Sequence, residues 1–127
     1  MAESLSFTAK NLLSNHKIHL KKSLGQNLMV DKNIVHKILC AAALDPSDTV
    51  IEIGCGTGIL TKELSKAAEQ VISFEIDKYI IAAAKDYLIE CPNIEIINAD
   101  FLKYDFEGLI KKLPPHKLPL KIVANLP

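Results

Sequence analysis

Three glycines stand at alternate positions, Gly54, Gly56 and Gly58, directly after the mostly apolar run Val50–Ile53. A helical pattern begins at Ile59. The stretch therefore predicts a buried parallel strand, a tight turn and the start of a helix. Glycine is needed where the backbone turns sharply or lies against a ligand, so we interpret this turn as a ligand-binding loop rather than an ordinary connection.

The spacing of this glycine loop excludes two phosphate-binding motifs. The dinucleotide fingerprint G-x-G-x-x-G would need a glycine where Ile59 stands, and a P-loop would need a Lys-Ser or Lys-Thr pair where Ile59-Leu60 stand. The form present is E-x-G-x-G-x-G, with Glu52 two residues before the first glycine. It resembles the first motif of S-adenosylmethionine-dependent methyltransferases, whose cofactor carries no phosphate.

Strands and helices alternate along the chain around this loop. We expect strands at 50–53, 71–75, 94–97 and 121–124, and helices at 31–44, 59–68, 78–90 and 106–112. A short helix is predicted at 8–16, after a frayed start. Asp31 and Asp77 are the expected N-caps. The pattern predicts an α/β fold with about four parallel strands and right-handed crossovers.

Polar residues end three of the predicted strands, and ligands in parallel sheets bind beyond these carboxyl ends. Glu75 suits a carboxylate that accepts hydrogen bonds from both ribose hydroxyls, because Asp77 already fills the capping role that is the alternative. Asp100 follows the third strand and either accepts from an adenine amino group or closes an Asx turn. Asn125 follows the fourth strand.

Length and composition predict a single globular domain without a membrane span. The chain has 127 residues, and no apolar run approaches the roughly 20 residues that a span needs. No signal peptide is visible. Three cysteines without CxxC spacing give neither a metal site nor a disulfide framework, and the histidines are scattered, so we expect no metal and a cytoplasmic protein.

Charge is unevenly spread along the chain. Residues 1–40 hold six Lys and two acidic residues, a net charge of +4, whereas residues 41–127 hold nine Lys and thirteen acidic residues, a net charge of −4. A basic arm can contact nucleic-acid phosphates, and the alternative is a solvated surface without a partner. Charge alone leaves both interpretations open.

Five segments, in this order, resemble the KsgA-type ribosomal RNA adenine dimethyltransferases. They are Lys21-Lys22-Ser23-Leu24-Gly25-Gln26-Asn27-Leu28, Ile51-Glu52-Ile53-Gly54-Cys55-Gly56-Thr57-Gly58, Phe74-Glu75-Ile76-Asp77, Asn98-Ala99-Asp100 and Ala124-Asn125-Leu126-Pro127. The Erm-type methyltransferases of large-subunit RNA are close relatives, but the first and last segments are more similar to the KsgA branch. The resemblance implies a partial Rossmann-like methyltransferase fold, with a basic arm and cofactor-covering segment at 1–30 and part of the catalytic domain at 31–127.

The resemblance also implies a reaction and a role for each matching residue. The reaction is methylation of two adjacent adenines of small-subunit ribosomal RNA with S-adenosylmethionine as donor, in ribosome biogenesis. Asn27 and the backbone around Met29 would cover the cofactor. Gly54, Glu75 and Asp100 would contact its amino-acid end, ribose and adenine. Asn125 and Pro127 would receive the target amine, and Asn125 borders the cofactor as well.

The chain stops at Pro127, before the aromatic residue that follows this motif in the family. We therefore expect an amino-terminal fragment that is inactive alone and monomeric. Two other functions stay open at this point. One is a non-catalytic RNA-binding relative of the same fold, and the other is a small-molecule N-methyltransferase.

Overall fold

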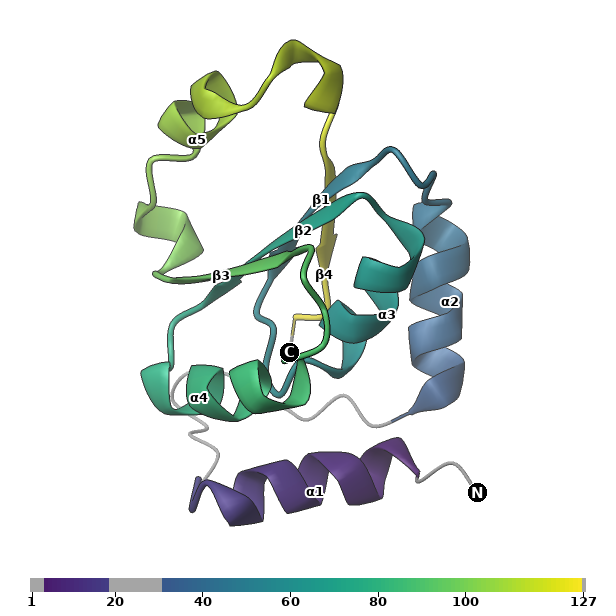
Figure 1. Cartoon of the computed structure of the whole chain (residues 1–127), viewed down its shortest axis with the longest axis vertical. Coiled ribbons are helices and arrows are strands. Elements are labelled where there is room, and N and C mark those ends of the chain that lie inside the picture. Colours follow the sequence, from purple (N-terminus) through teal and green to yellow (C-terminus); the bar gives the residue numbers. More distant parts are fainter. Residues whose placement is uncertain (1–3, 19–30, 127) are drawn as a thin grey trace.

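The computed structural model describes residues 4–18 and 31–126 and shows one sheet with helices on both faces (Figure 1). In chain order the elements are α1 (Leu5–Asn15), α2 (Lys32–Ala42), β1 (Thr49–Ile53), α3 (Ile59–Ala67), β2 (Gln70–Glu75), α4 (Lys78–Tyr87), β3 (Ile94–Asn98), η2 (Phe101–Lys103), α5 (Phe106–Lys112), η3 (Pro115–Lys117) and β4 (Lys121–Ala124), where η marks a 3₁₀ turn. None of these helices has the length and apolar character that a membrane span requires.

The strand order is β3-β2-β1-β4, and all pairs are parallel. The predicted Rossmann-like arrangement of four parallel strands is thus confirmed. The chain moves outward from β1 through β2 to β3, and then crosses back to place β4 on the other side of β1. Strand order reverses between β1 and β4, and such switch points are where open α/β sheets bind ligands.

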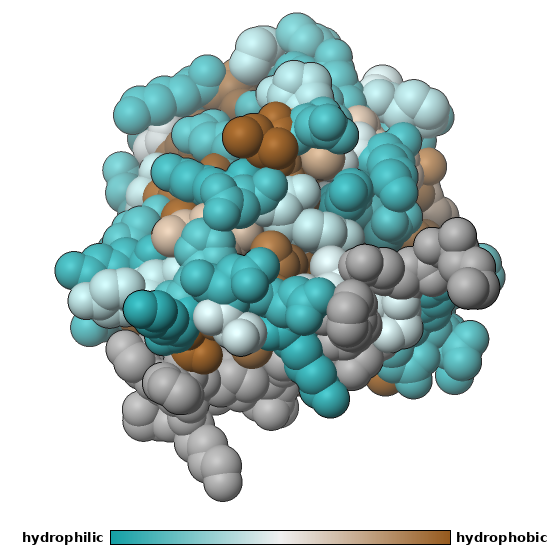
Figure 2. All heavy atoms as spheres, turned by 60° about the horizontal axis from the view of Figure 1, so that its bottom comes forward, coloured by the Kyte–Doolittle hydropathy of each residue, from teal (hydrophilic) through white to brown (hydrophobic). Residues whose placement is uncertain are grey.

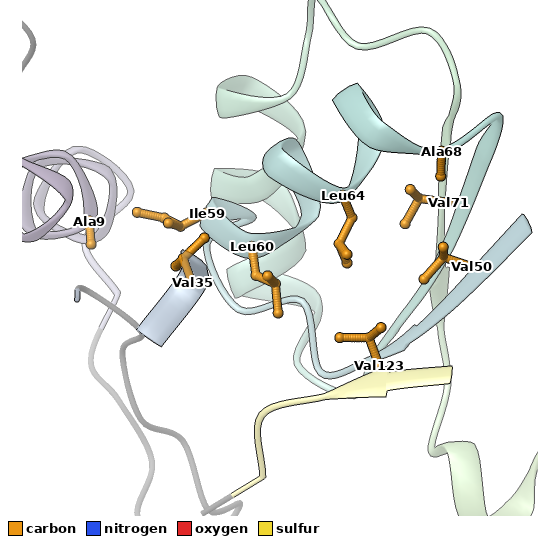
Figure 3. Close-up of a cluster of buried hydrophobic side chains, with 9 residues drawn as sticks. All are labelled: Ala9, Val35, Val50, Ile59, Leu60, Leu64, Ala68, Val71 and Val123. Atoms are coloured by element: carbon orange, nitrogen blue, oxygen red, sulfur yellow. The ribbon is translucent and has the colours of Figure 1, made fainter. Parts of the chain in front are cut away.

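One face of the sheet is covered by α2 and α3, and its core is aliphatic (Figure 3). Val50 and Val71 are register partners on β1 and β2, and both are fully buried. Leu64 of α3 is also fully buried in this cluster. Each such side chain contributes roughly 1.5–3 kcal/mol through the apolar area it removes from water. This packing fixes α3, and with it the loop that precedes α3.

The opposite face carries an aromatic core. Phe74 of β2 is buried, and the rings of Phe101 and Tyr104 meet it edge-on, with centroids 5.3 and 4.8 Å away. The ring of Phe106 in α5 meets Phe101 in the same way at 5.5 Å. Edge-to-face pairs of this kind add about 0.5–1.5 kcal/mol to area burial. The segment between β3 and β4 therefore folds onto the sheet although only α5 was predicted in it.

Helix α1 begins earlier than the sequence predicted. The expected helix spans 8–16, whereas the structure starts it at Leu5, with the backbone N–H of Thr8 donating to the carbonyl of Ser4 at 3.0 Å. Ala9 is fully buried in the aliphatic core, and His16 Nε2 lies 2.7 Å from Asp86 Oδ2 of α4. Tertiary packing of this kind stabilises a short helix that propensity alone leaves marginal.

The other element boundaries differ from the expected ones by a few residues. Helix α4 ends at Tyr87 rather than near residue 90, because Leu88 leaves the helical conformation as its C-cap. The N-caps Asp31 and Asp77 are confirmed, since each side chain accepts from backbone N–H groups of the first turn. The 3₁₀ turns η2 and η3 were not predicted, as three-residue elements carry no periodic signal.

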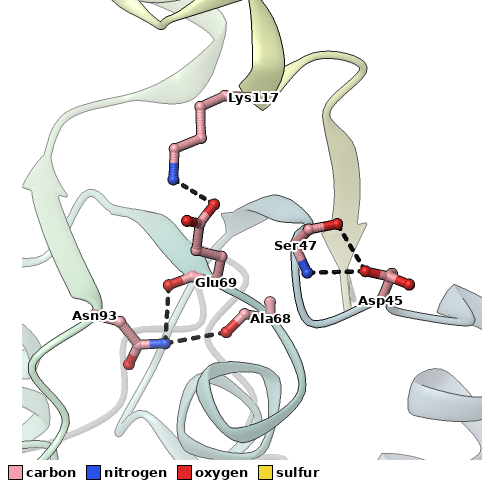
Figure 4. A network of polar contacts seen from close by, with 6 residues as sticks. All are labelled: Asp45, Ser47, Ala68, Glu69, Asn93 and Lys117. Atoms are coloured by element: carbon pink, nitrogen blue, oxygen red, sulfur yellow. Dashed lines mark hydrogen bonds and ion pairs between the residues drawn. The ribbon is translucent and has the colours of Figure 1, made fainter.

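The amino ends of β2 and β3 are joined by polar contacts (Figure 4). Asn93 Nδ2 donates to the carbonyls of Ala68 and Glu69 at 3.2 and 3.3 Å, and Lys117 Nζ forms an ion pair with Glu69. A shallow polar depression lies here, lined by Glu69, Gln70, Pro92, Asn93, Ile94, Glu95 and Lys117. It lies at the end of the sheet opposite to the glycine loop.

Candidate ligand-binding site at the carboxyl edge of the sheet

Residues that end neighbouring strands meet at one edge of the sheet. Ile53 is paired with Phe74 on β2 and with Ala124 on β4, so Gly54, Glu75 and Asn125 are the next residues on their strands. Glu75 is paired with Asn98 on β3. Adjacent strands lie about 4.8 Å apart, so the four ends span roughly 15 Å, the scale of a nucleoside with a side chain. The predicted convergence of strand ends is present in the structure.

The glycine loop uses left-handed backbone conformations at all three glycines. Their φ angles are +82° at Gly54, +53° at Gly56 and +92° at Gly58, a region that other residues rarely adopt. The N–H of Gly54 donates to the carbonyl of Phe74 at 2.7 Å, and that of Gly58 donates to the carbonyl of Cys55 at 2.9 Å. These bonds anchor the loop at both ends.

The three glycines serve two different purposes. A Cβ at Gly58 would lie 2.8 Å from Leu88 Cδ1, so this glycine lets α3 and the end of α4 pack closely. Among the residues that the structure describes, no atom lies within 4 Å of a Cβ placed at Gly54 or Gly56. The loop therefore presents a bare backbone surface to open space at Gly54 and Gly56, as a loop that lies against a ligand would.

Glu75 is tied to the glycine loop. The residue is buried, with 7% of its surface exposed. Its Oε1 accepts a hydrogen bond from the N–H of Gly56 at 3.1 Å, and its Oε2 accepts one from the N–H of Asp77 at 3.0 Å. Sequence reasoning did not foresee the bond to Gly56, because it joins residues on two different turns. A carboxylate has about four lone-pair positions, so these two bonds leave acceptor capacity for ligand hydroxyls.

Asn98 supports the same turn from β3. Its Nδ2 donates to the carbonyl of Glu75 at 2.9 Å and to that of Ile76 at 3.1 Å. The amide thereby fixes the backbone from which the Glu75 side chain projects. The sequence had given no role to Asn98, although a polar residue at a predicted strand end was a visible signal.

Asp100 and Asn125 occupy the outer parts of the edge. Asp100 is half-buried, and its Oδ1 accepts from the N–H of Leu102 at 3.0 Å, which is the Asx turn that the sequence left as the alternative. This bond uses one oxygen and leaves the other acceptor positions open to a ligand. Asn125 is exposed immediately after β4. The ligand roles of both residues stay predictions.

Glu52 lies below the loop and is almost completely buried, at 1% exposure. Its Oε1 accepts from the hydroxyls of Thr61 on α3 and Ser73 on β2. Burial raises the pKa of the Glu52 carboxyl to about 7, the two hydroxyl bonds oppose this shift, and the charge of Glu75 adds to it. The sequence marked Glu52 only as part of a motif.

Several predicted residues lie outside the described residues. They are Asn27, Met29 and Pro127, together with Lys21 and Lys22. Within 4–18 and 31–126, no group of three or more His, Cys, Asp or Glu side chains is placed to hold a metal ion. His16 Nε2 pairs with Asp86 Oδ2, and His36 Nε2 lies 3.5 Å from Cys40 Sγ.

Comparison with known proteins identifies relatives over most of the chain. The ribosomal RNA adenine dimethylase family matches residues 17–127. The ribosomal RNA small subunit methyltransferase A of Clostridioides difficile (strain 630) is 43% identical over 121 residues, which is 93% of this chain and 40% of that protein. The protein of the same name from Streptococcus uberis is 46% identical over 116 residues, 91% of this chain and 40% of that protein. The chain thus spans about 40% of the length of these relatives.

Solved structures give the same picture. The crystal structure of the 23S rRNA methyltransferase ErmE superposes with a TM-score of 0.66 at 37% identity, covering 80% of this chain and 38% of that one. A dimethyladenosine transferase from Plasmodium falciparum gives a TM-score of 0.64 at 32% identity, covering 80% of this chain and 34% of that one. The comparisons of sequence and of structure thus agree on the fold.

Proposed function

Because the chain belongs to the ribosomal RNA adenine dimethylase family, we propose that the protein transfers methyl groups from S-adenosylmethionine to adenine. The acceptors in this proposal are the exocyclic amines of two adjacent adenines in small-subunit ribosomal RNA. The relatives from Clostridioides difficile and Streptococcus uberis, whose names specify the small ribosomal subunit, favour that target over large-subunit RNA.

The observation that carries this proposal is the pairing of a bare loop with a fixed carboxylate. Gly54 and Gly56 leave open space where side chains would project, and Glu75 is held beside them by its bond to the N–H of Gly56. An adenosine joined to an amino acid fits this arrangement, because its amino-acid end can lie against the bare backbone at Gly54 and Glu75 suits a pair of hydroxyls.

Each residue of the edge then has a defined task. Gly54 contacts the amino-acid end of the cofactor, Glu75 accepts from the ribose hydroxyls, and Asp100 accepts from the adenine amino group. Asn27 and the backbone at Met29 cover the cofactor from the amino-terminal segment. When bound, S-adenosylmethionine supplies an electrophilic methyl group.

The acceptor side is assigned to the end of β4. An exocyclic adenine amine is a weak nucleophile, since its lone pair is delocalised into the ring. The side-chain oxygen of Asn125 and the backbone carbonyl of Pro127 accept hydrogen bonds from the two N–H bonds of the amine and so turn its lone pair toward the methyl group. Catalysis in this scheme comes from positioning and electrostatics rather than from a strong base. The target base must leave its stack to reach the pocket.

Contact with RNA is assigned to the basic amino-terminal part. Lys10 and Lys17 are exposed in the structure, and Lys21 and Lys22 continue the same charge along the sequence. Lysines of this kind bind phosphates without reading sequence. We assign the protein to the cytoplasm, as a monomer that acts on the small ribosomal subunit.

Methyl transfer by the full-length protein to small ribosomal subunits that lack the modification tests this function. Labelled S-adenosylmethionine should give two methyl groups on each of two adjacent adenines, found by digestion of the RNA and mass analysis. Subunits that already carry the modification are the matched control and should accept no label. Binding of subunits without transfer would instead identify a non-catalytic relative, and label on small amines alone would identify a small-molecule methyltransferase.

A further inference from the structure

Glu52 is a buried acid that the proposed reaction does not yet use. It lies on β1 between Ser73 of β2 and Val123 of β4, which are its register partners. All three residues are buried, and the two hydrogen bonds that Glu52 accepts come from the neutral hydroxyls of Thr61 and Ser73. Both bonds end on Oε1, and Oε2 receives neither.

The charged groups around Glu52 do not neutralise it. On β2 the nearest is another carboxylate, Glu75, whose charge acts on Glu52. On β4, Lys121 directs its Nζ to the carbonyls of Ala42 and Ala43 and to Asp48 Oδ2, at 2.7–3.0 Å. On α3, Lys62 Nζ lies over the ring of Tyr87, 4.6 Å from its centroid. Among the residues that the structure describes, no cation forms an ion pair with Glu52.

Another titratable group that interacts with Glu52 is the thiol of Cys55 in the glycine loop. Burial is the largest cause that raises the pKa of that thiol well above its ordinary value, and the charges of Glu52 and Glu75 raise it further. The thiol therefore stays neutral. Glu52 and Glu75 are thus two buried acids next to the glycine loop, and no described residue covers that loop at Gly54 and Gly56. An ionised carboxylate without a counter-ion is costly in such surroundings, and a cation brought close to it removes part of that cost.

The two forms of the cofactor differ by one such cation. The methyl donor carries a permanently charged sulfonium, and the product of transfer carries a neutral thioether in its place. We propose that Glu52 is a specificity-determining residue that makes the site prefer the methyl donor to the demethylated product, by attracting the sulfonium charge from beneath the glycine loop. This inference rests on the proposed function, since it takes S-adenosylmethionine as the ligand of the loop.

Proton release should accompany this preference. The pKa of Glu52 lies at about 7 in the free protein, so its carboxyl is partly protonated at neutral pH. The donor binds the ionised form better, and the proton that leaves Glu52 passes to the buffer. Binding linkage then requires the preference for the donor to increase as pH rises through this range.

Calorimetric titration of S-adenosylmethionine and S-adenosylhomocysteine between about pH 5.5 and about pH 8.5 tests the inference. The two compounds share their α-amino group, so its titration largely cancels in the ratio of their Kd values. We expect that ratio to change by about ten-fold for each unit by which the sulfonium lowers the pKa of Glu52. Buffers of different ionisation enthalpy should show more protons released by the donor than by the product near neutral pH.

Two kinds of variant sharpen the test. In Glu52→Gln the ratio should be flat with pH and the extra proton release should vanish. In Ser73→Ala and Thr61→Val the carboxyl remains but loses one donor, so the midpoint of the change should move to higher pH. A wild-type ratio that does not vary with pH would overturn the inference while leaving the proposed function in place. Failure of either compound to bind at any pH would overturn both.

Discussion

The carboxylate of Glu75 accepts a hydrogen bond from the backbone N–H of Gly56 at 3.1 Å, and so joins the end of β2 to the glycine loop after β1. Glu75, which we assign to the ribose of the cofactor, therefore also supports the glycine loop, which we assign to the amino-acid end of the cofactor. Asn98 fixes the backbone of Glu75 from the third strand.

Replacing Glu75 by Ala should weaken binding of S-adenosylmethionine. The change removes hydrogen bonds made by a charged acceptor, which are worth about 1.5–3 kcal/mol, or roughly ten- to 150-fold in Kd. Calorimetry measures the loss. Glu95→Ala is the matched control, because Glu95 is an exposed acid near the amino end of β3. This variant should bind S-adenosylmethionine as tightly as the unmodified protein does. Equal affinities for both variants would remove Glu75 from the site.

Replacing Gly54, Gly56 and Gly58 one at a time by Ala should show which glycines are needed for packing and which for cofactor binding. Gly58→Ala forces a left-handed residue and a Cβ 2.8 Å from Leu88 Cδ1, so urea unfolding should show a loss of more than about 1–2 kcal/mol. Gly54→Ala and Gly56→Ala bear the conformational cost without the clash, and should lose less stability. Cofactor binding should nevertheless fall in these two variants, since their Cβ atoms enter the open space. Equal stability losses at all three positions would contradict this division.

Stability without ligand should decrease as pH rises from about 4.5 to about 7. The pKa of Glu52 is raised by burial from 4.5 to about 7, so the folded state holds a proton that the unfolded chain has released. The stabilisation is complete below the unfolded pKa and is lost as pH passes the folded one, on the order of 3 kcal/mol.

Urea unfolding of the unmodified protein and of Glu52→Gln across this range checks the expectation. The difference between their free energies of unfolding should change by the amount just given, in favour of Glu52→Gln at the higher pH. Hydrogen bonds lower the pKa values of Asp45 and Asp48, so these two residues change stability at lower pH. Their effect is the same in the unmodified protein and in Glu52→Gln. Parallel pH curves would show that Glu52 does not titrate in this window.

In the full-length protein, replacing Asn125 by Ala should abolish methyl transfer and leave cofactor binding largely intact. Asn125 is exposed after β4, beyond the contacts that hold the glycine loop and Glu75. Its proposed task is to orient the acceptor amine, which matters only for transfer. Transfer to unmodified small subunits and calorimetry on the same preparation provide the two readouts. Robust transfer by the variant would refute the role given to Asn125.

The sequence predicted those features that depend on local pattern. The apolar run before Gly54 and the three alternate glycines were enough to place β1, the loop and α3, and the predicted strand ends put Glu75 and Asp100 at the carboxyl edge of the sheet. It did not predict contacts that join distant elements. The Gly56–Glu75 bond spans 19 residues and the Glu52–Ser73 bond spans 21, and no periodicity reports such pairs.

The predicted start of α1 was wrong for the same reason. The pattern around Thr8 carried no sign that Ala9 would be buried among Val35 and Ile59, or that His16 would pair with Asp86. These tertiary contacts favour a helix that starts at Leu5. Local propensity is a weak guide wherever packing decides the outcome.

Titration of the ¹⁵N-labelled protein with S-adenosylmethionine, followed by amide chemical shifts, tests the central claim most directly. The claim is that the carboxyl edge of the sheet binds this cofactor. Saturable shifts should occur at Gly54, Gly56, Glu75 and Asp100, while Asn93 and Lys117 at the opposite edge stay unchanged. Folded protein without saturable shifts, or shifts confined to the depression around Asn93, would contradict the account.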